Sequence, residues 1–213
     1  MSTFRLVRSV AGPVSPAVRV EAARGLAAET IHAANDAFVD VLLREGEWPV
    51  GRGALPLTLL QALRSLSCVQ RRRISALPFT LFSLRFSDAA FWRGLIEQST
   101  EPPRRGGVDE SFCRTAVFLA WHLAHVGPNT AGMALGMSSD VVALYQWVSL
   151  SDLDRLAALA QSAIAPRWPA HSGFWRRLLD AAQYPPSIDA ARYFGLHLLA
   201  GECLPRDESR LRA

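Results

Sequence analysis

Two long stretches of the chain place apolar residues three and four positions apart. Within residues 27–48 and 108–129, the apolar positions with this spacing include Phe38, Val41, Leu42, Val117, Trp121 and Ala124. Such spacing puts the apolar side chains on one face of a helix, so both stretches are predicted to be amphipathic helices. Each is followed by a break and then by a short apolar helix, at 57–66 and 140–150.

Two segments of the chain show the same order of predicted elements and short motifs. Residues 65–98 and 149–182 both open on Ser-Leu-Ser, continue as an apolar helix, reach a proline and close on Phe-Trp-Arg followed by an apolar pair. The openings are 84 residues apart and the closings 83. Chance rarely preserves this order together with the motif, so the sequence indicates an internal repeat.

One stretch, 79–86, alternates apolar and polar residues as a strand does, through Phe82, Leu84 and Phe86. Its counterpart in the second copy, 162–170, shows no alternation and carries two prolines. We therefore expect an extended connector at this place and not a sheet.

The predicted fold is all-α: a helical bundle built from two tandem similar units that form an intrachain pseudo-dimer. The units are expected to pack together because neither alone would bury its Phe, Trp and Leu side chains. The predicted parts are an N-terminal arm (1–15), a first helical repeat (16–98), a linker rich in proline, glycine and charge (99–110), a second helical repeat (111–182), and a C-terminal helix and tail (183–213).

Residues 129–147, NTAGMALGMSSDVVALYQW, resemble a DNA-binding helix-turn-helix in their small, turn and apolar positions. A helix that reads DNA must also present Arg, Lys, Asn or Gln to base edges and phosphates. The second half of this stretch has no Arg or Lys, and its one charge is Asp140, near the helix N-terminus where a phosphate would dock. We interpret the stretch as a helix corner packed inside the bundle.

The first copy carries different chemistry, because Arg71, Arg72 and Arg73 stand consecutively in its Ser-Leu-Ser helix. Three consecutive arginines project around most of a helical turn, so some must face solvent. There they could meet phosphates or an acidic partner, which makes them the candidate contact residues for a partner or a nucleic acid. The simpler interpretation is a solvated helix face.

Composition narrows the class of protein further. All 23 basic residues are arginine, as a GC-rich bacterial coding sequence would produce, and the net charge of +4 is spread along the chain. A dedicated nucleic-acid binder usually concentrates its charge on one face. The sequence has no apolar run of about 20 residues, no secretory signal, and three distant cysteines without a CxxC pair. We expect a cytoplasmic protein that does not contact membranes.

No catalytic constellation stands out in the sequence. His122 and His125 have a spacing that suits a shared metal ion, but no third ligand and no HExxH pattern accompany them. A Walker loop, a GxGxxG after a strand and a GxSxG elbow are also absent. We therefore expect a non-enzymatic protein with no cofactor and no bound metal.

Residues 118–157, FLAWHLAHVGPNTAGMALGMSSDVVALYQWVSLSDLDRLA, resemble the bacterial flagellar transcriptional regulator family FlhD. The shared order is a long helix, a Leu-Gly-hydrophobic turn, a short apolar helix, a Leu-Ser step and a helix ending in Leu-Ala. Through the repeat, a vaguer version extends over residues 28–98. This chain departs from the family in being about twice as long, in duplicating the unit and in adding a C-terminal helix.

The resemblance implies a helical protein that dimerises and acts through protein contacts, while a partner protein contributes much of the DNA contact. We therefore predict a regulatory or protein-interaction module that acts in transcriptional regulation through an unidentified protein partner. Nucleic acid would be contacted indirectly, by a monomer with internal pseudo-symmetry or by a homodimer. The alternative is a direct DNA-binding transcription factor that uses Arg71, Arg72 and Arg73.

Overall fold

The computed structural model describes residues 16–44, 54–98 and 110–203, and over these ranges the fold is all-α, as predicted. None of the described helices is long and apolar enough to cross a membrane. The predicted N-terminal arm and nearly all of the predicted linker lie outside the described residues. The helices are α1 (Pro16–Leu43), α2 (Leu57–Ser65), α3 (Cys68–Ser75), α4 (Ala89–Glu97), α5 (Glu110–Val126), α6 (Pro128–Leu135), α7 (Ser139–Trp147), α8 (Leu153–Ala160), α9 (Ser172–Gln183) and α10 (Ile188–Cys203), with short 3-10 turns at Leu150–Asp152, Gln161–Ala163 and Pro185–Ser187.

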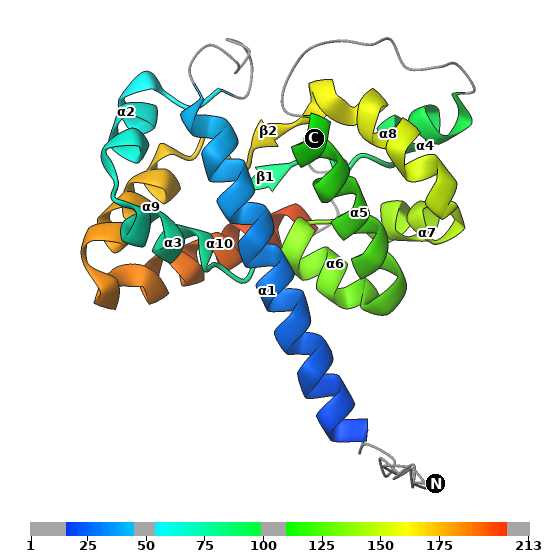
Figure 1. The fold of residues 1–213 in the computed structure, drawn as a ribbon, viewed down its shortest axis with the longest axis horizontal. Helices are drawn as coiled ribbons and strands as arrows, with labels where there is room; N and C mark the ends of the chain where they lie inside the picture. Colours follow the sequence, from blue (N-terminus) through cyan, green and yellow to red (C-terminus); the bar gives the residue numbers. More distant parts are fainter. Residues whose placement is uncertain (1–15, 45–53, 99–109, 204–213) are drawn as a thin grey trace, which may run out of the picture.

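Two short strands pair where the sequence predicts only an extended connector (Figure 1). β1 (Phe82–Ser83) and β2 (Ala165–Pro166) run antiparallel, with Phe82 opposite Pro166 and Ser83 opposite Ala165. The prediction of a connector without a sheet was wrong because so short a ladder needs no N–H from the proline. The next residue supplies it instead, since the Arg167 N–H donates to the Leu81 carbonyl at 2.8 Å.

The helices that follow the two strands are exchanged between the halves of the chain. α4 follows β1 but packs on α7 and α8, whereas α9 follows β2 but packs on α2 and α3. Figure 1 shows the result as two groups of helices, α2, α3 and α9 on one side of α1 and α4, α7 and α8 beside α5. Neither of the stretches predicted as repeats therefore holds a complete group of packed helices.

Two arginines form hydrogen bonds that hold α9 to α3 and α4 to α8. Arg73 of α3 donates from Nη1 to the Ala182 carbonyl, near the end of α9, at 2.9 Å. Arg155 of α8 donates from Nη1 to the Leu95 carbonyl, near the end of α4, at 3.2 Å. The last carbonyls of a helix lack partners within the helix and carry partial negative charge, so a guanidinium is well suited to them.

The core forms where the two long helices meet the strands. Phe38 of α1, Phe82 of β1 and Phe112 of α5 are buried, with ring centroids 5.0–5.6 Å apart. The Phe82 and Phe112 rings meet edge to face, and the Phe38 ring is tilted against both. Aromatic rings at this separation bury large apolar areas. Since these three side chains come from α1, β1 and α5, they join the halves into one core.

A buried asparagine fixes the connector that leads into β1. Asn35 of α1 is fully buried, and its Nδ2 donates to the carbonyls of Ser75 and Phe79 at 3.1 and 2.9 Å. Its Oδ1 accepts from the Leu81 N–H at 2.8 Å. Because the Asn35 amide satisfies three backbone groups, this irregular segment can be buried without leaving those groups unpaired.

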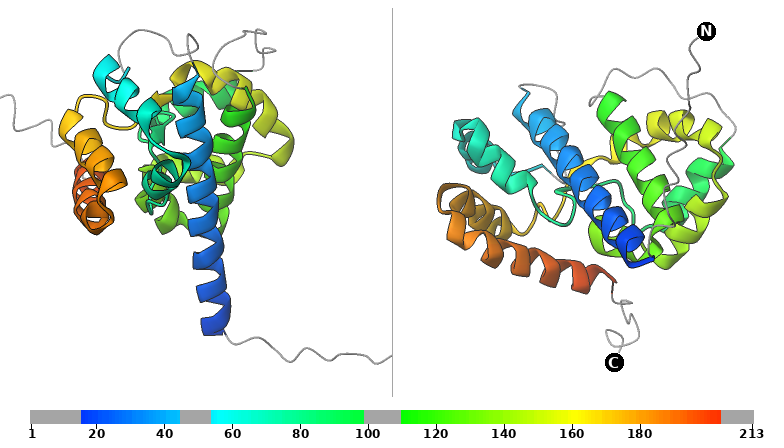
Figure 2. Two further views of the ribbon diagram at one scale, coloured as in Figure 1. Left: turned by 60° about the vertical axis from the view of Figure 1, so that its left-hand side comes forward. Right: turned by 60° about the horizontal axis from the view of Figure 1, so that its bottom comes forward.

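α10 closes the fold at the C-terminal side. It packs along α9, as both views in Figure 2 show. Gly195 permits this approach, because a Cβ at that position would lie 2.1 Å from the Phe79 ring. The last turn of α10 thereby comes close to the residues that follow β2.

Candidate functional site

The helix-turn-helix-like stretch forms α6, a tight turn and α7. Gly136 ends α6 in the left-handed conformation, with φ +68°, and Ser138 caps α7 by accepting from the Val141 N–H. The inner face of α7, formed by Val141, Val142 and Tyr145, is buried against the neighbouring helices α4, α5 and α6.

The outer face of α7 lies in solvent and carries almost no charge. Its one ionic residue is Asp140, and it ends in an indole that is 91% exposed, that of Trp147. Leu150, in the turn that follows, is 59% exposed. The exposed positions are Ser139, Asp140, Ala143, Gln146 and Trp147.

The residues on both sides of Trp147 are hydrogen-bonded to α5. The Gln146 side chain donates from Nε2 to the Ala124 carbonyl at 3.1 Å, and the Trp121 indole donates to the Val148 carbonyl at 2.9 Å. Trp147 is therefore an exposed aromatic side chain on a fixed backbone, and not part of a frayed end.

The three consecutive arginines separate in the structure. Arg71 donates from Nη2 to the Arg64 carbonyl at 3.1 Å, and Arg73 donates to the Ala182 carbonyl as described above. Both are half-buried, whereas Arg72 is exposed. Of the predicted contact residues, Arg72 is thus the one whose side chain lies in solvent.

The turns after the two strands follow the same backbone course. The β1–α4 turn (residues 84–88) and the β2–α9 turn (residues 167–171) pass through the same sequence of local conformations, 83 residues apart. Each has a residue with positive φ at the matching place, Arg85 at 56° and Trp168 at 53°. Non-glycine residues rarely adopt this conformation, so surrounding contacts must hold both of them there.

Side chains in the β1–α4 turn serve the local structure. Leu84 is fully buried. Arg85 lies 4.5 Å above the Phe91 ring and pairs with Asp88, which caps α4 by accepting from the Phe91 N–H at 2.9 Å. That backbone hydrogen bond, together with Arg85, lowers the pKa of the Asp88 carboxyl below its ordinary value.

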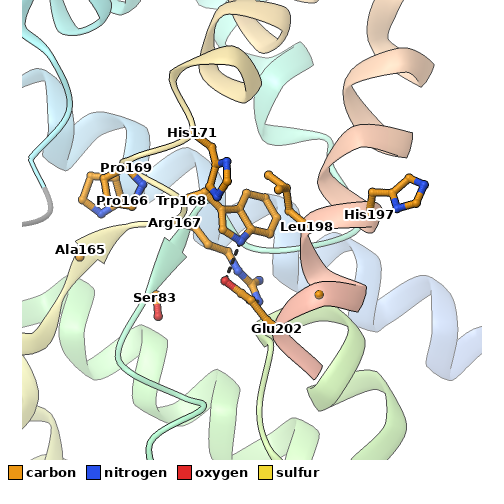
Figure 3. A pocket seen from close by; sticks show the side chains of 11 residues that line it. Ser83, Ala165, Pro166, Arg167, Trp168, Pro169, His171, His197, Leu198 and Glu202 are labelled. Atoms are coloured by element: carbon orange, nitrogen blue, oxygen red, sulfur yellow. Dashed lines mark hydrogen bonds and ion pairs between the residues drawn. The ribbon is translucent and has the colours of Figure 1, made fainter. Parts of the chain in front are cut away.

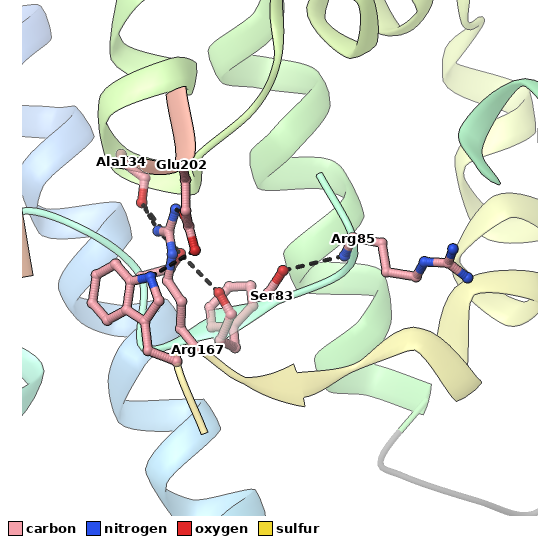
Figure 4. Close-up of polar contacts among 8 residues, drawn as sticks. Ser83, Arg85, Ala134, Arg167 and Glu202 are labelled. Carbon is pink, nitrogen blue, oxygen red and sulfur yellow. Dashed lines mark hydrogen bonds and ion pairs between the residues drawn. The ribbon is translucent and has the colours of Figure 1, made fainter. Parts of the chain in front are cut away.

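The β2–α9 turn instead buries a charge. Arg167 takes the place of Leu84 and is only 2% exposed. Its Nη1 donates to the Ala134 carbonyl at 3.0 Å and to Thr80 Oγ1 at 3.3 Å, while its Nη2 pairs with Glu202 Oε2 at 2.8 Å. Figure 4 shows these contacts converging on one guanidinium, with Arg85 extending away on the opposite side.

Trp168 completes this arrangement. Its indole Nε1 donates to Glu202 Oε1 at 2.6 Å, so Glu202 receives one donor on each oxygen. The Arg167 guanidinium also lies 4.9 Å from the Trp168 ring. Gly136 leaves room for the ion pair, because a Cβ there would lie 1.9 Å from Arg167 Nη2.

A cavity of about 530 Å³ opens beside this ion pair. Figure 3 shows Glu202 directed toward Arg167 and Trp168, with His171 nearby on the β2–α9 turn. The remaining lining is mostly apolar, with Ser83 and His197 as its polar members, and it comes from β1, β2, the turn and the end of α10. It includes Ala165, Pro166, Pro169 and Leu198.

The helices that carry Phe-Trp also differ in how they satisfy their indoles. Trp175 donates from Nε1 to the Arg167 carbonyl at 3.0 Å. Trp92 is as fully buried as Trp175, and its ring lies against that of Tyr145 with centroids 5.0 Å apart. Within the described part of the chain, neither the Trp92 Nε1 nor the Tyr145 hydroxyl has a hydrogen-bond partner. Burial raises the pKa of Tyr145 well above its ordinary value.

Arg167, Trp168 and Glu202 were not among the site residues predicted from the sequence. A usable signal was present, because aligning the two Phe-Trp-Arg motifs places Arg167 opposite Leu84. A charge that replaces a core leucine in one of two matching segments calls for an explanation. Glu202 carries no such signal, since its role depends on how α10 packs.

The described residues therefore define an all-α protein with two notable features: the exposed Trp147 at the end of α7, and the cavity beside the Arg167–Glu202 ion pair. No group of three or more His, Cys, Asp or Glu side chains in the described ranges is placed to hold a metal ion. No family model, no curated protein and no solved structure matches this chain.

Proposed function

We propose that this chain is a non-enzymatic protein-interaction module of the FlhD type, which acts in bacterial transcriptional regulation through a protein partner. The observation that carries this proposal is Trp147, an almost fully exposed indole whose neighbours Gln146 and Val148 are both hydrogen-bonded to α5. Tryptophan is enriched among the residues that dominate binding energy at interfaces. A preformed backbone also lowers the entropic cost of docking.

The chemistry of the α7 outer face favours a protein over DNA as the direct partner. Trp147 and Leu150 offer apolar area, whereas Asp140 would repel phosphates. The occupant that fits this face is a protein with an apolar recess for the Trp147 indole. DNA would then be contacted chiefly by that partner.

An internal duplication is part of this proposal, with the two halves acting as an intrachain pseudo-dimer. The pairing of the strands supports it, because Phe82 pairs with Pro166, the counterpart of Ser83, and Ser83 pairs with Ala165, the counterpart of Phe82. Such reciprocal contacts are those that a two-fold axis produces. The exchange of α4 and α9 supports the same interpretation.

The test is a quantitative capture experiment on extracts of a GC-rich bacterium, with the wild-type chain, Trp147→Ala and Tyr193→Ala immobilised in parallel. Tyr193 is 73% exposed on α10 and provides a matched loss of exposed aromatic area. We expect a partner that wild type and Tyr193→Ala retain and that Trp147→Ala binds at least about tenfold more weakly, without a change in thermal stability. Equal capture by all three variants would refute the proposal.

Direct DNA binding is the competing function, and Arg72 is the exposed residue that would carry it. Fluorescence anisotropy with mixed-sequence DNA at two salt concentrations distinguishes the two. We expect no binding in the micromolar range. Binding that weakens steeply with salt and is lost in Arg72→Ala would favour the direct DNA-binding alternative.

A further inference from the structure

We propose that the cavity beside Glu202 binds a small organic acid, whose carboxylate replaces that of Glu202 on Arg167 and Trp168. This site is separate from the exposed face of α7, and the inference does not depend on the proposed protein partner.

The two donors define the chemistry of the ligand. Arg167 Nη2 and Trp168 Nε1 each reach one oxygen of the same carboxylate, at 2.8 and 2.6 Å. Two donors that converge on the two oxygens of one group recognise a planar carboxylate. The guanidinium is buried and held by the Ala134 carbonyl and Thr80, so it is oriented before any ligand arrives.

The shape of the cavity defines the rest of the ligand. Its volume of about 530 Å³ lies within the usual range for small-molecule sites. Its walls include Pro166, Pro169 and Leu198, which suit an apolar body next to the carboxylate. An aromatic or branched aliphatic acid has both features.

Glu202 can leave its position more easily than a core residue. It stands in the last turn of α10, and its side chain is 35% exposed, so the displaced carboxylate can be solvated. Its neighbour Gly201 is exposed, and a Cβ added there would meet nothing within 4 Å. The packing around this turn therefore leaves space for it to move.

The fold itself does not require a charge at this place. In the β1–α4 turn, which has the same backbone course, Leu84 fills the position of Arg167. A buried ion pair is not in general more stabilising than an apolar residue of similar size. Ligand recognition gives the Arg167–Glu202 pair a role that stability alone does not.

The probe for this site is benzoate, with benzamide as its uncharged analogue. The readout is the indole 1H–15N signal of Trp168, which is identified by its loss in Trp168→Phe, a change that keeps an aromatic ring against Phe79 and Phe174. We expect benzoate, and not benzamide, to shift this signal in the wild-type chain. Glu202→Ala should bind benzoate about tenfold more tightly, because the internal competitor is gone.

A matched control removes another carboxylate from the same helix. Asp189→Ala loses the exposed Asp189–Arg192 ion pair of α10 and should leave the affinity for benzoate unchanged. Three results would each overturn the proposal: no shift in either the wild type or Glu202→Ala, equal shifts with benzamide, or binding by Glu202→Ala alone. The last result would mean that benzoate only fills the space left by a structural glutamate.

Discussion

The β1–α4 turn and the β2–α9 turn share a backbone course but bury different chemistry. The first turn places Leu84 in the core and uses Arg85 and Asp88 to start α4. The second buries Arg167 at the same position and pairs it with Glu202, beside a cavity. Matching backbones with different side chains indicate which features the fold requires and which serve another purpose.

The backbone course is the shared and therefore structural feature. Both turns lead from a strand through a residue of positive φ into a Phe-Trp helix that packs on the other half of the chain. The buried charge, that of Arg167, belongs to the second turn alone. Its carboxylate partner comes from α10, which packs along α9.

The largest expected effect comes from giving the first turn the charge of the second. Leu84→Arg would bury a guanidinium in a turn whose own carboxylate, Asp88, already serves Arg85 and the N-terminus of α4. We expect a loss of about 3–5 kcal/mol in the free energy of unfolding, measured in urea. Leu84→Met is the control and should lose less than about 1.5 kcal/mol. If Leu84→Arg lost no more stability than Leu84→Met, the first turn would tolerate a buried charge as well as the second turn does.

A smaller loss is expected from Gly136→Ala, which adds a methyl group beside the Arg167 guanidinium. The new Cβ would lie 1.9 Å from Arg167 Nη2 on a backbone with φ +68°. We expect a loss of about 2–3 kcal/mol from displacement of the ion pair and from backbone strain. In an Arg167→Leu background the loss should shrink to the strain alone, about 1 kcal/mol. An unchanged loss in that background would mean that the ion pair plays no part.

The N-termini of α4 and α9 give a third comparison. Asp88 caps α4 with its side chain, whereas His171, at the same position before α9, forms no side-chain cap. Asp88→Ala should lose about 1 kcal/mol near neutral pH, and His171→Asp should gain up to about the same amount. Thermal unfolding of both variants measures the difference, and a destabilising His171→Asp would contradict the equivalence of the two positions.

The Asp88 effect should depend on pH in a defined direction. Its carboxyl has a lower pKa in the folded protein than in the unfolded chain, so the unfolded state takes up the proton first on acidification. The contribution of Asp88 is therefore complete above its unfolded pKa of about 3.9 and is lost as the pH falls through the folded pKa. Wild type and Asp88→Ala should converge in stability as the pH falls through this range. A difference that persisted below it would show that the carboxylate charge is not the cause.

The smallest expected effect concerns the Tyr145 hydroxyl, which lies beside the Trp92 indole. Tyr145→Phe removes a buried hydroxyl that has no hydrogen-bond partner in the described residues and should stabilise the protein by up to about 1 kcal/mol. Trp175→Phe, by contrast, removes the hydrogen bond to the Arg167 carbonyl and should destabilise it. If Tyr145→Phe lowers the stability in thermal unfolding, the hydroxyl has a partner after all.

Much of the fold follows from the sequence because it depends on local patterns. Apolar spacing predicts the helices, and the left-handed turn at Gly136 with the Ser138 cap follows from short-range residue preferences. The pairing of β1 with β2 does not, because each strand has only two residues and one contains a proline. The exchange of α4 and α9 is also a matter of long-range packing that periodicity does not record.

The candidate sites were predictable to different degrees. The absence of Arg and Lys from α7 is visible in the sequence, but the exposure of Trp147 is not, since an apolar helix end is equally consistent with burial. Arg71, Arg72 and Arg73 look alike in the sequence, yet tertiary contacts engage Arg73 at the end of α9 and leave Arg72 in solvent. The ion pair with Glu202 depends on a helix that joins the site from the end of the chain.

The two turns share the backbone course that the fold needs, and the buried charge of the second turn is additional to it. Arg167→Leu tests it most directly, because the Ala134 carbonyl keeps its contacts with Thr80, and the partly exposed Glu202 keeps Trp168. We expect the free energy of unfolding in urea to change by less than about 1 kcal/mol. A loss of about 3 kcal/mol or more would contradict it, because the buried charge would then be a requirement of the fold.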